Sequence, residues 1–240
     1  MGFYTMIGFF QKGGLFMYPI LFVFVAGMVI AAERWLQLSR VRVVNRRVWN
    51  MLQPILARGD FDKAREIINK DKSTISQMLG MGLARQGLVR RREDIEIAME
   101  ESMMEIIPQL EKRTPYVALL SNIATLLGLL GTIMGLIEAF TAVANANPAE
   151  KADLLSASIS VAMNTTAFGL MSAIPLLLLH AKLTSTTGQI VDSLEMASVK
   201  ALNSISSFSR RQLEAKAELS GGAQSTPIRN SQVESVPSGA

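Results

Sequence analysis

The chain has 240 residues, of which 49% are hydrophobic and 18% are charged, and its formal net charge is +4 at pH 7. This composition is too apolar for an ordinary soluble domain of that length and indicates a membrane protein that lies in a lipid bilayer. With no cysteine and one histidine, the sequence excludes disulfides and cysteine-metal sites and offers too few imidazoles for a histidine cluster, so we expect no metal site.

Residues 15–32 form the first uncharged stretch that can cross a bilayer, for which a helix needs ~20 residues. A cleaved signal peptide is the alternative, but only Lys12 precedes the stretch, whereas five arginines follow it by residue 47. The sequence after it also lacks a small-residue cleavage site. We therefore expect an uncleaved first transmembrane helix over 15–38, preceded by a short segment over 1–14.

The region over 39–113 has helical patterns without a competing strand pattern. Asp60 is placed to cap a helix that ends near Asn69, and 70–86 is a second, weakly amphipathic stretch. The sequence therefore predicts a helical region between the first and second spans.

A further helical pattern starts at Arg91, where apolar residues recur at helical spacing. Pro108 is the only strong breaker before the next uncharged stretch begins at Thr114. We therefore expect this helix to run on into the second transmembrane helix, over 114–144, with a kink near Pro108 or Pro115. A rigid helical rod would then join the region over 39–113 to the second transmembrane helix.

The second and third apolar stretches carry matching stripes of small and hydroxyl residues. Positions 125, 128, 132 and 135 are Thr, Gly, Thr and Gly, and their spacing of three and four places them on one helix face. The third span, predicted over 154–181, repeats this spacing at 162, 166, 169 and 173. We expect the two helices to pack as a hairpin joined by a loop over 145–153. The residues expected to set the close packing are Gly128, Gly131, Gly135, Gly169, Ala173 and Pro175.

Residues 182–217 keep helix-forming residues, with Ile190, Leu194, Ala197 and Ala201 on one face, and predict a long amphipathic helix. Ser, Gly, Pro and Gln dominate the end of the chain, so 218–240 is predicted to be a disordered tail. The predicted fold class is an all-α membrane protein with three transmembrane helices and long helical extensions.

The charged residues predict the orientation. Residues 33–113 contain 16 Lys and Arg against 12 Asp and Glu, whereas 138–153 contains only Lys151 against three acidic residues. The positive-inside rule therefore places 39–113 and the C-terminal helix in the cytoplasm, and the N-terminus and the 145–153 loop on the far side.

No Asp, Glu, Lys or Arg occurs in the interior of the predicted spans, over 15–32, 114–137 and 154–181, so the chain has no side chain that can bind and release a proton at the bilayer midplane. If the chain conducts ions, a partner must supply the charge. The hydroxyls of Thr132, Thr165 and Thr166 have two interpretations, because a membrane-helix threonine commonly bonds its own helix four residues back. Asn164 favours a helix neighbour or a wet cavity, since an amide in hydrocarbon needs partners.

Two of these segments resemble the signatures of a known family. Residues 126–135, LLGLLGTIMG, followed by Ala139-Phe140, are similar to the second-span signature of the MotA/TolQ/ExbB proton channel family. Residues 164–170, NTTAFGL, followed by 173–175, AIP, resemble its third-span motif. The order of the spans also agrees, and the resemblance extends to about residue 216, closest to the ExbB/TolQ branch.

The resemblance implies a multi-pass subunit of the bacterial inner membrane, with a periplasmic N-terminus and a cytoplasmic C-terminus, that forms a homopentamer around an ExbD/TolR-type single-span partner. The partner's membrane aspartate would carry the ion, and Thr132 and Thr166, at the family's threonine positions, would line its path. Ion flow would drive rotation and mechanical work on a TonB- or TolA-like envelope protein, as in TonB-dependent import. Apart from the transported ion, no cofactor is expected.

One departure leaves the ion open. Many ExbB and TolQ members have a glutamate five residues before the third-span threonine, where this chain has Val161. Because Thr165 and Asn164 add oxygen ligands to the candidate pathway, sodium is an alternative to the proton. His180 is either a proton acceptor at the exit or an interfacial ring, and Glu138 is a candidate entrance group.

Other classes of function stay open at this point. A MotA-like stator usually has four spans, whereas three are visible here, and a passive membrane scaffold would need only the packing stripes. An enzyme is the weakest alternative, because no nucleophile, base and orienting group converge in the sequence. No motif or basic-aromatic pattern indicates a nucleic-acid partner.

Overall fold

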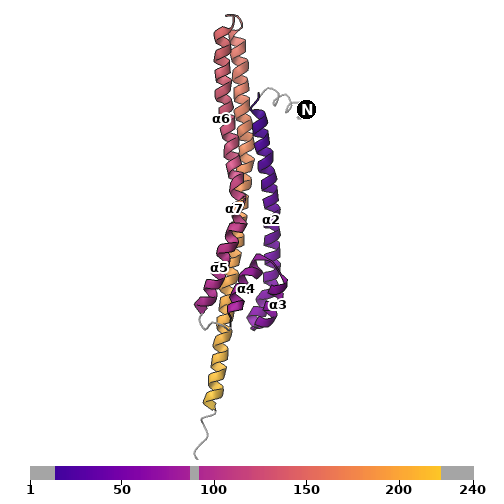
Figure 1. Ribbon diagram of the computed structural model, residues 1–240, viewed down its shortest axis with the longest axis vertical. Helices are drawn as coiled ribbons and strands as arrows, with labels where there is room; N and C mark the ends of the chain where they lie inside the picture. Colours follow the sequence, from indigo (N-terminus) through magenta and orange to yellow (C-terminus); the bar gives the residue numbers. More distant parts are fainter. Residues whose placement is uncertain (1–13, 87–91, 223–240) are drawn as a thin grey trace, which may run out of the picture.

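The computed structural model describes residues 14–86 and 92–222, and the regular elements in these ranges are all α-helices (Figure 1). The α6 and α7 helices form a long hairpin, α2 packs against both of them, and α3 and α4 lie beside the lower part of α2. The predicted all-α fold class is confirmed. Labelled as in Figure 1, the helices are α2 (Met17–Arg58), α3 (Phe61–Lys70), α4 (Thr74–Arg85), α5 (Arg92–Glu111), α6 (Thr114–Asn145) and α7 (Lys151–Gly222).

Three helical stretches in the described residues are long and apolar enough to cross a membrane. Many of their large apolar side chains point away from the protein, as at Phe22, Leu126 and Leu178, which are 75%, 62% and 68% exposed. Such surfaces are stable only against lipid or another protein chain. The limits of the spans in the bilayer stay predictions. The stretches are Met17–Arg58, Arg92–Ala144 and Lys151–Arg211.

The α7 helix is the spine of the molecule, because α2, α4, α5 and α6 all pack against it. Its predicted amphipathic face is confirmed, since Ile190, Leu194, Ala197 and Ala201 are all buried. They join a core to which α2 through α6 also contribute. The lower part of the molecule therefore has an interior built like that of a soluble helical domain.

The end of α7 differs from the prediction. The helix continues to Gly222, so residues 218–222 are helical, although the sequence predicts a disordered tail from 218. The Gly221-Gly222 pair is the first strong helix breaker along this segment, which explains why the helix extends so far. The predicted tail over 223–240 and the N-terminal residues 1–13 lie outside the described residues.

Two short helices pack beside α2. Asp60 caps α3 as predicted, because its carboxylate accepts a hydrogen bond from the backbone N–H of Lys63 at 3.2 Å. Asn45 is a buried residue of α2 and exchanges hydrogen bonds with the hydroxyl of Thr74 at 2.7 and 3.0 Å. These contacts hold the start of α4 against α2.

The stretch over 70–86 is not one continuous helical unit. The α3 helix ends at Lys70 and α4 begins at Thr74. Ser73 has an extended backbone between them, and its hydroxyl accepts a hydrogen bond from the N–H of Ser76 at 3.3 Å. A serine in this conformation is a helix N-cap, so it starts a new helix with a new direction.

The predicted rigid rod from Arg91 through the second span is wrong, because the helix is interrupted. The α5 helix ends at Glu111 and α6 begins at Thr114, with Arg113 between them at φ 67°. Pro115 gives the reason: a continuous helix would set its ring against the Glu111 carbonyl, four residues back. Pro108 is tolerated inside α5.

The α2 helix holds this junction between α5 and α6 in place. The guanidinium of Arg34 donates a short hydrogen bond to the carbonyl of Leu110, and Glu33 pairs with Arg113 at 2.5 Å. Charged and aromatic residues such as Glu33, Arg34 and Trp35 at the end of a span are typical of interfacial anchors, but Arg34 is 5% exposed and lies inside the protein. Arg34 is therefore a structural residue that satisfies a carbonyl at the end of α5.

Candidate functional site

The stripes of small residues meet where α6 crosses α7. A Cβ atom on Gly169 would lie 2.9 Å from both the Cα of Gly128 and the carbonyl oxygen of Ala124. About two turns further, a Cβ atom on Gly135 would lie 2.8 Å from that of Ala162. The structure therefore brings the two stripes into backbone contact, at a distance that only glycine allows.

The remaining packing residues extend this contact in both directions. Gly131 faces the side chain of Thr165, which a Cβ atom would overlap. Ala173 is buried beside Ile20 of α2. Pro175 is half-buried inside α7 and removes one N–H from the helix hydrogen bonds. These positions line the interior of a three-helix contact between α2, α6 and α7.

Thr132 and Thr166 lie opposite each other in the hairpin. Their hydroxyls are in direct hydrogen-bond contact, and each also lies near the Gly128 carbonyl, Thr132 at 3.2 Å and Thr166 at 2.9 Å. The two hydroxyls have only two protons for these three contacts. Either threonine can therefore donate to the Gly128 carbonyl while the other donates to its partner threonine, and the two patterns can interchange by rotation of the hydroxyl protons alone. Both residues are half-buried. The pair forms a small polar point in an otherwise apolar helix contact.

The other two candidate pathway residues do not join this pair. Thr165 is buried and donates to the carbonyl of Val161 in its own helix at 2.9 Å. Asn164 is half-buried, and its amide makes no hydrogen bond with any residue in the described ranges. Among these threonines, the interpretation as a local helix bond therefore holds for Thr165, whereas Thr166 reaches across the hairpin.

Sequence reasoning missed a second polar bridge in the hairpin. Ser121 is fully buried, and its hydroxyl donates to the carbonyl of Ala173 on α7 at 2.8 Å. The signal was present, because Ser121 lies four residues before Thr125 and extends the same stripe by one turn. Thr125 itself bonds the Ser121 carbonyl at 3.2 Å.

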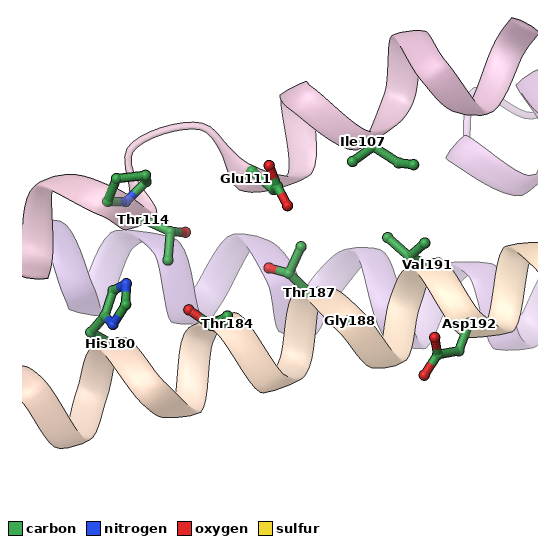
Figure 2. Close-up of a pocket in the computed structure, with 10 residues that line it drawn as sticks. Ile107, Glu111, Thr114, His180, Thr184, Thr187, Gly188, Val191 and Asp192 are labelled. Carbon is green, nitrogen blue, oxygen red and sulfur yellow. The ribbon is translucent and has the colours of Figure 1, made fainter.

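Among the residues that the structure describes, none places an ionisable side chain in this part of the hairpin. Val161 is half-buried. It stands at the position where many members of the family that the sequence resembles have a glutamate. Glu138 is exposed, six residues beyond Thr132 on α6. His180 lies far along α7, half-buried, in a pocket that also contains Thr114 (Figure 2). The hydroxyl pair can thus pass a proton or contact a hydrated ion, but it cannot hold charge.

Comparison with known proteins gives this geometry a context. A sequence model of the MotA/TolQ/ExbB proton channel family matches residues 70–196. That match covers more than half of the chain. The chain belongs to the MotA/TolQ/ExbB proton channel family. The matched residues of this family member include the hairpin and the Thr132–Thr166 pair, and the resemblance seen in the sequence is confirmed.

Curated relatives of this family member carry names from the same group. A protein of Methanothermobacter thermautotrophicus, named as a biopolymer transport protein ExbB homolog, is 27% identical over 194 residues, which is 80% of this chain and 67% of the relative. An ExbB-like protein of Synechocystis is 29% identical over 76% of this chain and 72% of its own length. The Tol-Pal system protein TolQ of Haemophilus influenzae is 34% identical over 86 residues, which is 36% of this chain and 37% of the relative.

Proposed function

We propose that the chain is the channel-forming subunit of an ion-driven motor in a bacterial inner membrane. It would couple the proton-motive force, through an ExbD/TolR-type partner, to mechanical work on envelope processes such as TonB-dependent import. The observation that carries the proposal is the contact between the Thr132 and Thr166 hydroxyls, at a level of the hairpin where the described residues include no ionisable side chain.

This arrangement suits a wall of an ion path whose charge comes from another chain. A hydroxyl both donates and accepts, so it can pass a proton to or from a partner carboxylate without retaining it. An aspartate on a partner helix would supply the titratable group that these spans lack. The energy available is about 2.3 kcal/mol for each charge that crosses 100 mV.

The proposed assembly is a homopentamer around the partner helix, with the N-terminus in the periplasm and the C-terminus in the cytoplasm. Exposed apolar residues on α6 support it, because Leu129, Ile133 and Ile137 are 50%, 57% and 53% exposed in the single chain. Such residues need lipid or a neighbouring subunit. A TonB- or TolA-like protein would receive the work, and we propose neither an enzymatic activity nor a bound cofactor.

The deciding experiment replaces one hydroxyl without changing side-chain shape. Thr166→Val, co-expressed with the partner and reconstituted in proteoliposomes, should lose ion flux while the complex still assembles. Thr186→Val is the matched control, because Thr186 is a buried threonine of the same helix whose hydroxyl donates to the Lys182 carbonyl, away from the Thr132–Thr166 pair. The passive scaffold would be favoured instead if most of the Thr166→Val complex failed to assemble and the small amount that did assemble carried normal ion flux.

Sodium is the second candidate ion, and Val161 is the observation that favours it. Without a glutamate at that position, the described residues around the threonine pair offer only neutral oxygen ligands, which suit a hard cation such as sodium. Varying the sodium concentration at a fixed proton-motive force separates the two ions. Activity that follows sodium and ignores an uncoupler would overturn the proton assignment.

A further inference from the structure

A pocket of about 460 Å³ lies where the junction between α5 and α6 faces α7 (Figure 2). We call it the junction pocket and define it by Glu111, Thr114, His180, Thr187 and Gly188, which line it. A single water molecule needs only ~30 Å³. The junction pocket therefore has room for an ion together with its hydration shell.

Ionisable groups gather in the junction pocket. Glu111 extends from the end of α5 toward α7, the His180 ring points toward Thr114, and Asp192 lies at the opposite end from His180 (Figure 2). Glu111 makes no ion pair within the described residues, and the nearby Arg113 is paired with Glu33. These groups do not form a cluster that could chelate a metal ion. They suit an ion that passes through rather than one that stays.

Two buried hydroxyls beside the junction pocket have no hydrogen-bond partner among the described residues, namely those of Thr114 and Thr187. Each residue is 5% exposed. The neighbouring Thr186 instead donates to the Lys182 carbonyl of its own helix at 2.9 Å. Because buried polar groups are nearly always paired, two orphan hydroxyls next to a large space indicate ordered water in the pocket.

The position of the junction pocket fits the end of an ion path. His180 follows Thr166 by 14 residues in one helix, which corresponds to ~21 Å along the helix axis. Half of a bilayer's hydrocarbon core is ~15 Å thick. From Thr132 toward the start of α6, the first carboxylate in the sequence is Glu111. Thr166 lies near the middle of the predicted third span, over 154–181, so the pocket would lie just beyond the membrane core.

We propose that the junction pocket is the site at which the transported monovalent cation leaves the hairpin for cytoplasmic water, with Glu111 as the carboxylate that receives it. A proton would add to this carboxylate and leave to water, whereas a sodium ion would exchange its contacts for bulk water. The cation is not chemically changed by this transfer, so the step needs no other reactant. This inference rests on the proposed function.

Gly188 allows a steric test. A Cβ atom there would meet no heavy atom within 4 Å, so a larger side chain can fill the pocket without displacing its walls. We expect Gly188→Leu to lower ion flux by about tenfold or more, a barrier increase of ~1.4 kcal/mol. Ser185→Leu, the matched control at an exposed position of the same helix that does not line the pocket, should keep wild-type flux. Equal flux in the two variants would overturn the proposal.

Glu111 allows a test by charge. Glu111→Gln removes the carboxylate at constant size and should lower flux to a similar degree. Glu105→Gln is the control, because Glu105 is an exposed residue of the same helix that does not line the pocket. Flux is measured in proteoliposomes that hold the complete complex with its partner, using separate proton- and sodium-sensitive dyes. Equal flux in the two glutamine variants would exclude the role of Glu111.

The same vesicles separate the inference from the function on which it rests. If the wild-type complex carries neither ion, the proposed function fails. If Thr166→Val abolishes flux but Gly188→Leu and Glu111→Gln keep it, the proposed function stands and the junction pocket is not the exit. Loss of flux in all three variants, with both controls active, supports both proposals.

Discussion

Gly169 and Gly128 lie so close that a single Cβ atom on Gly169 would stand 2.9 Å from the Cα of Gly128. This backbone contact places the Thr132 and Thr166 hydroxyls within reach of each other, because Thr166 lies one turn from Gly169 and Thr132 one turn from Gly128. The hydroxyl pair therefore depends on the glycine pair, and the two can be tested separately.

We expect Gly169→Ala to destabilise the hairpin by ~1–3 kcal/mol, since the new methyl group would press on backbone atoms that cannot rotate away. The measurement is the thermal midpoint of the purified complex in detergent. Gly188→Ala on the same helix is the control, because its Cβ atom would meet open space. Replacing a helical glycine there should be neutral or stabilising by up to ~1 kcal/mol. A Gly169→Ala midpoint at or above that of Gly188→Ala would contradict the packing account.

Thr132→Val should lower ion flux, whereas Thr132→Ser should retain most of it. Valine keeps the shape of threonine but has no hydroxyl, so the contacts with Thr166 and the Gly128 carbonyl are lost. Serine keeps the hydroxyl and loses only a methyl group. Flux into proteoliposomes, normalised to assembled complex, gives the comparison. The hydroxyl has no role in transport if the valine and serine variants carry ions equally well.

Arg34→Met should loosen the junction between α5 and α6. The change leaves the Leu110 carbonyl without its donor, and losing a buried hydrogen bond to a charged group costs ~1.5–3 kcal/mol. Because the Lys112-Arg113 turn contains two trypsin sites, limited trypsin digestion should cut there faster. Arg40→Met, at an exposed position of α2, is the control. Identical cleavage rates in both variants would show that Arg34 does not hold the junction.

Asp71 makes the short segment before α4 sensitive to pH. Burial raises the pKa of its carboxyl, but hydrogen bonds from Ser73 and Ser76 outweigh this effect and hold the pKa below its ordinary value. The stabilisation is therefore present above the unfolded pKa of ~3.9 and is lost as pH falls through the lower folded value.

We accordingly expect Asp71→Asn to speed amide hydrogen exchange in α4 at pH 7, with a smaller difference from wild type below pH ~4. Asp62→Asn is the control, because the Asp62 side chain is 96% exposed and, within the described residues, forms an ion pair only with Arg65, at 3.4 Å. A difference that is constant across this pH range would show that the Asp71 charge is not responsible.

Periodicity predicted the hairpin well, because residues three and four apart on a helix share a face whatever lies around them. The N-cap preference of aspartate predicted the Asp60 cap, and the spacing of apolar residues predicted the buried face of α7, because both depend on neighbouring residues alone. Local sequence patterns did not predict the interruption of the helix at Arg113. Pro115 disfavours a continuous helix, but a kink would also relieve the clash, and the turn observed is held by Arg34 and Glu33 from a distant part of the sequence.

The sequence by itself therefore determined an all-helical membrane protein with paired stripes of small residues, since apolar length and helical period are local properties. Tertiary structure decided which hydroxyls meet. Thr165 and Thr166 are neighbours in sequence but differ by about 100° around the helix, from ~3.6 residues per turn, and only the rotation of α7 against α6 selects Thr166 to face Thr132. The junction pocket likewise exists because α2 holds the break between α5 and α6 beside α7, which no local pattern specifies.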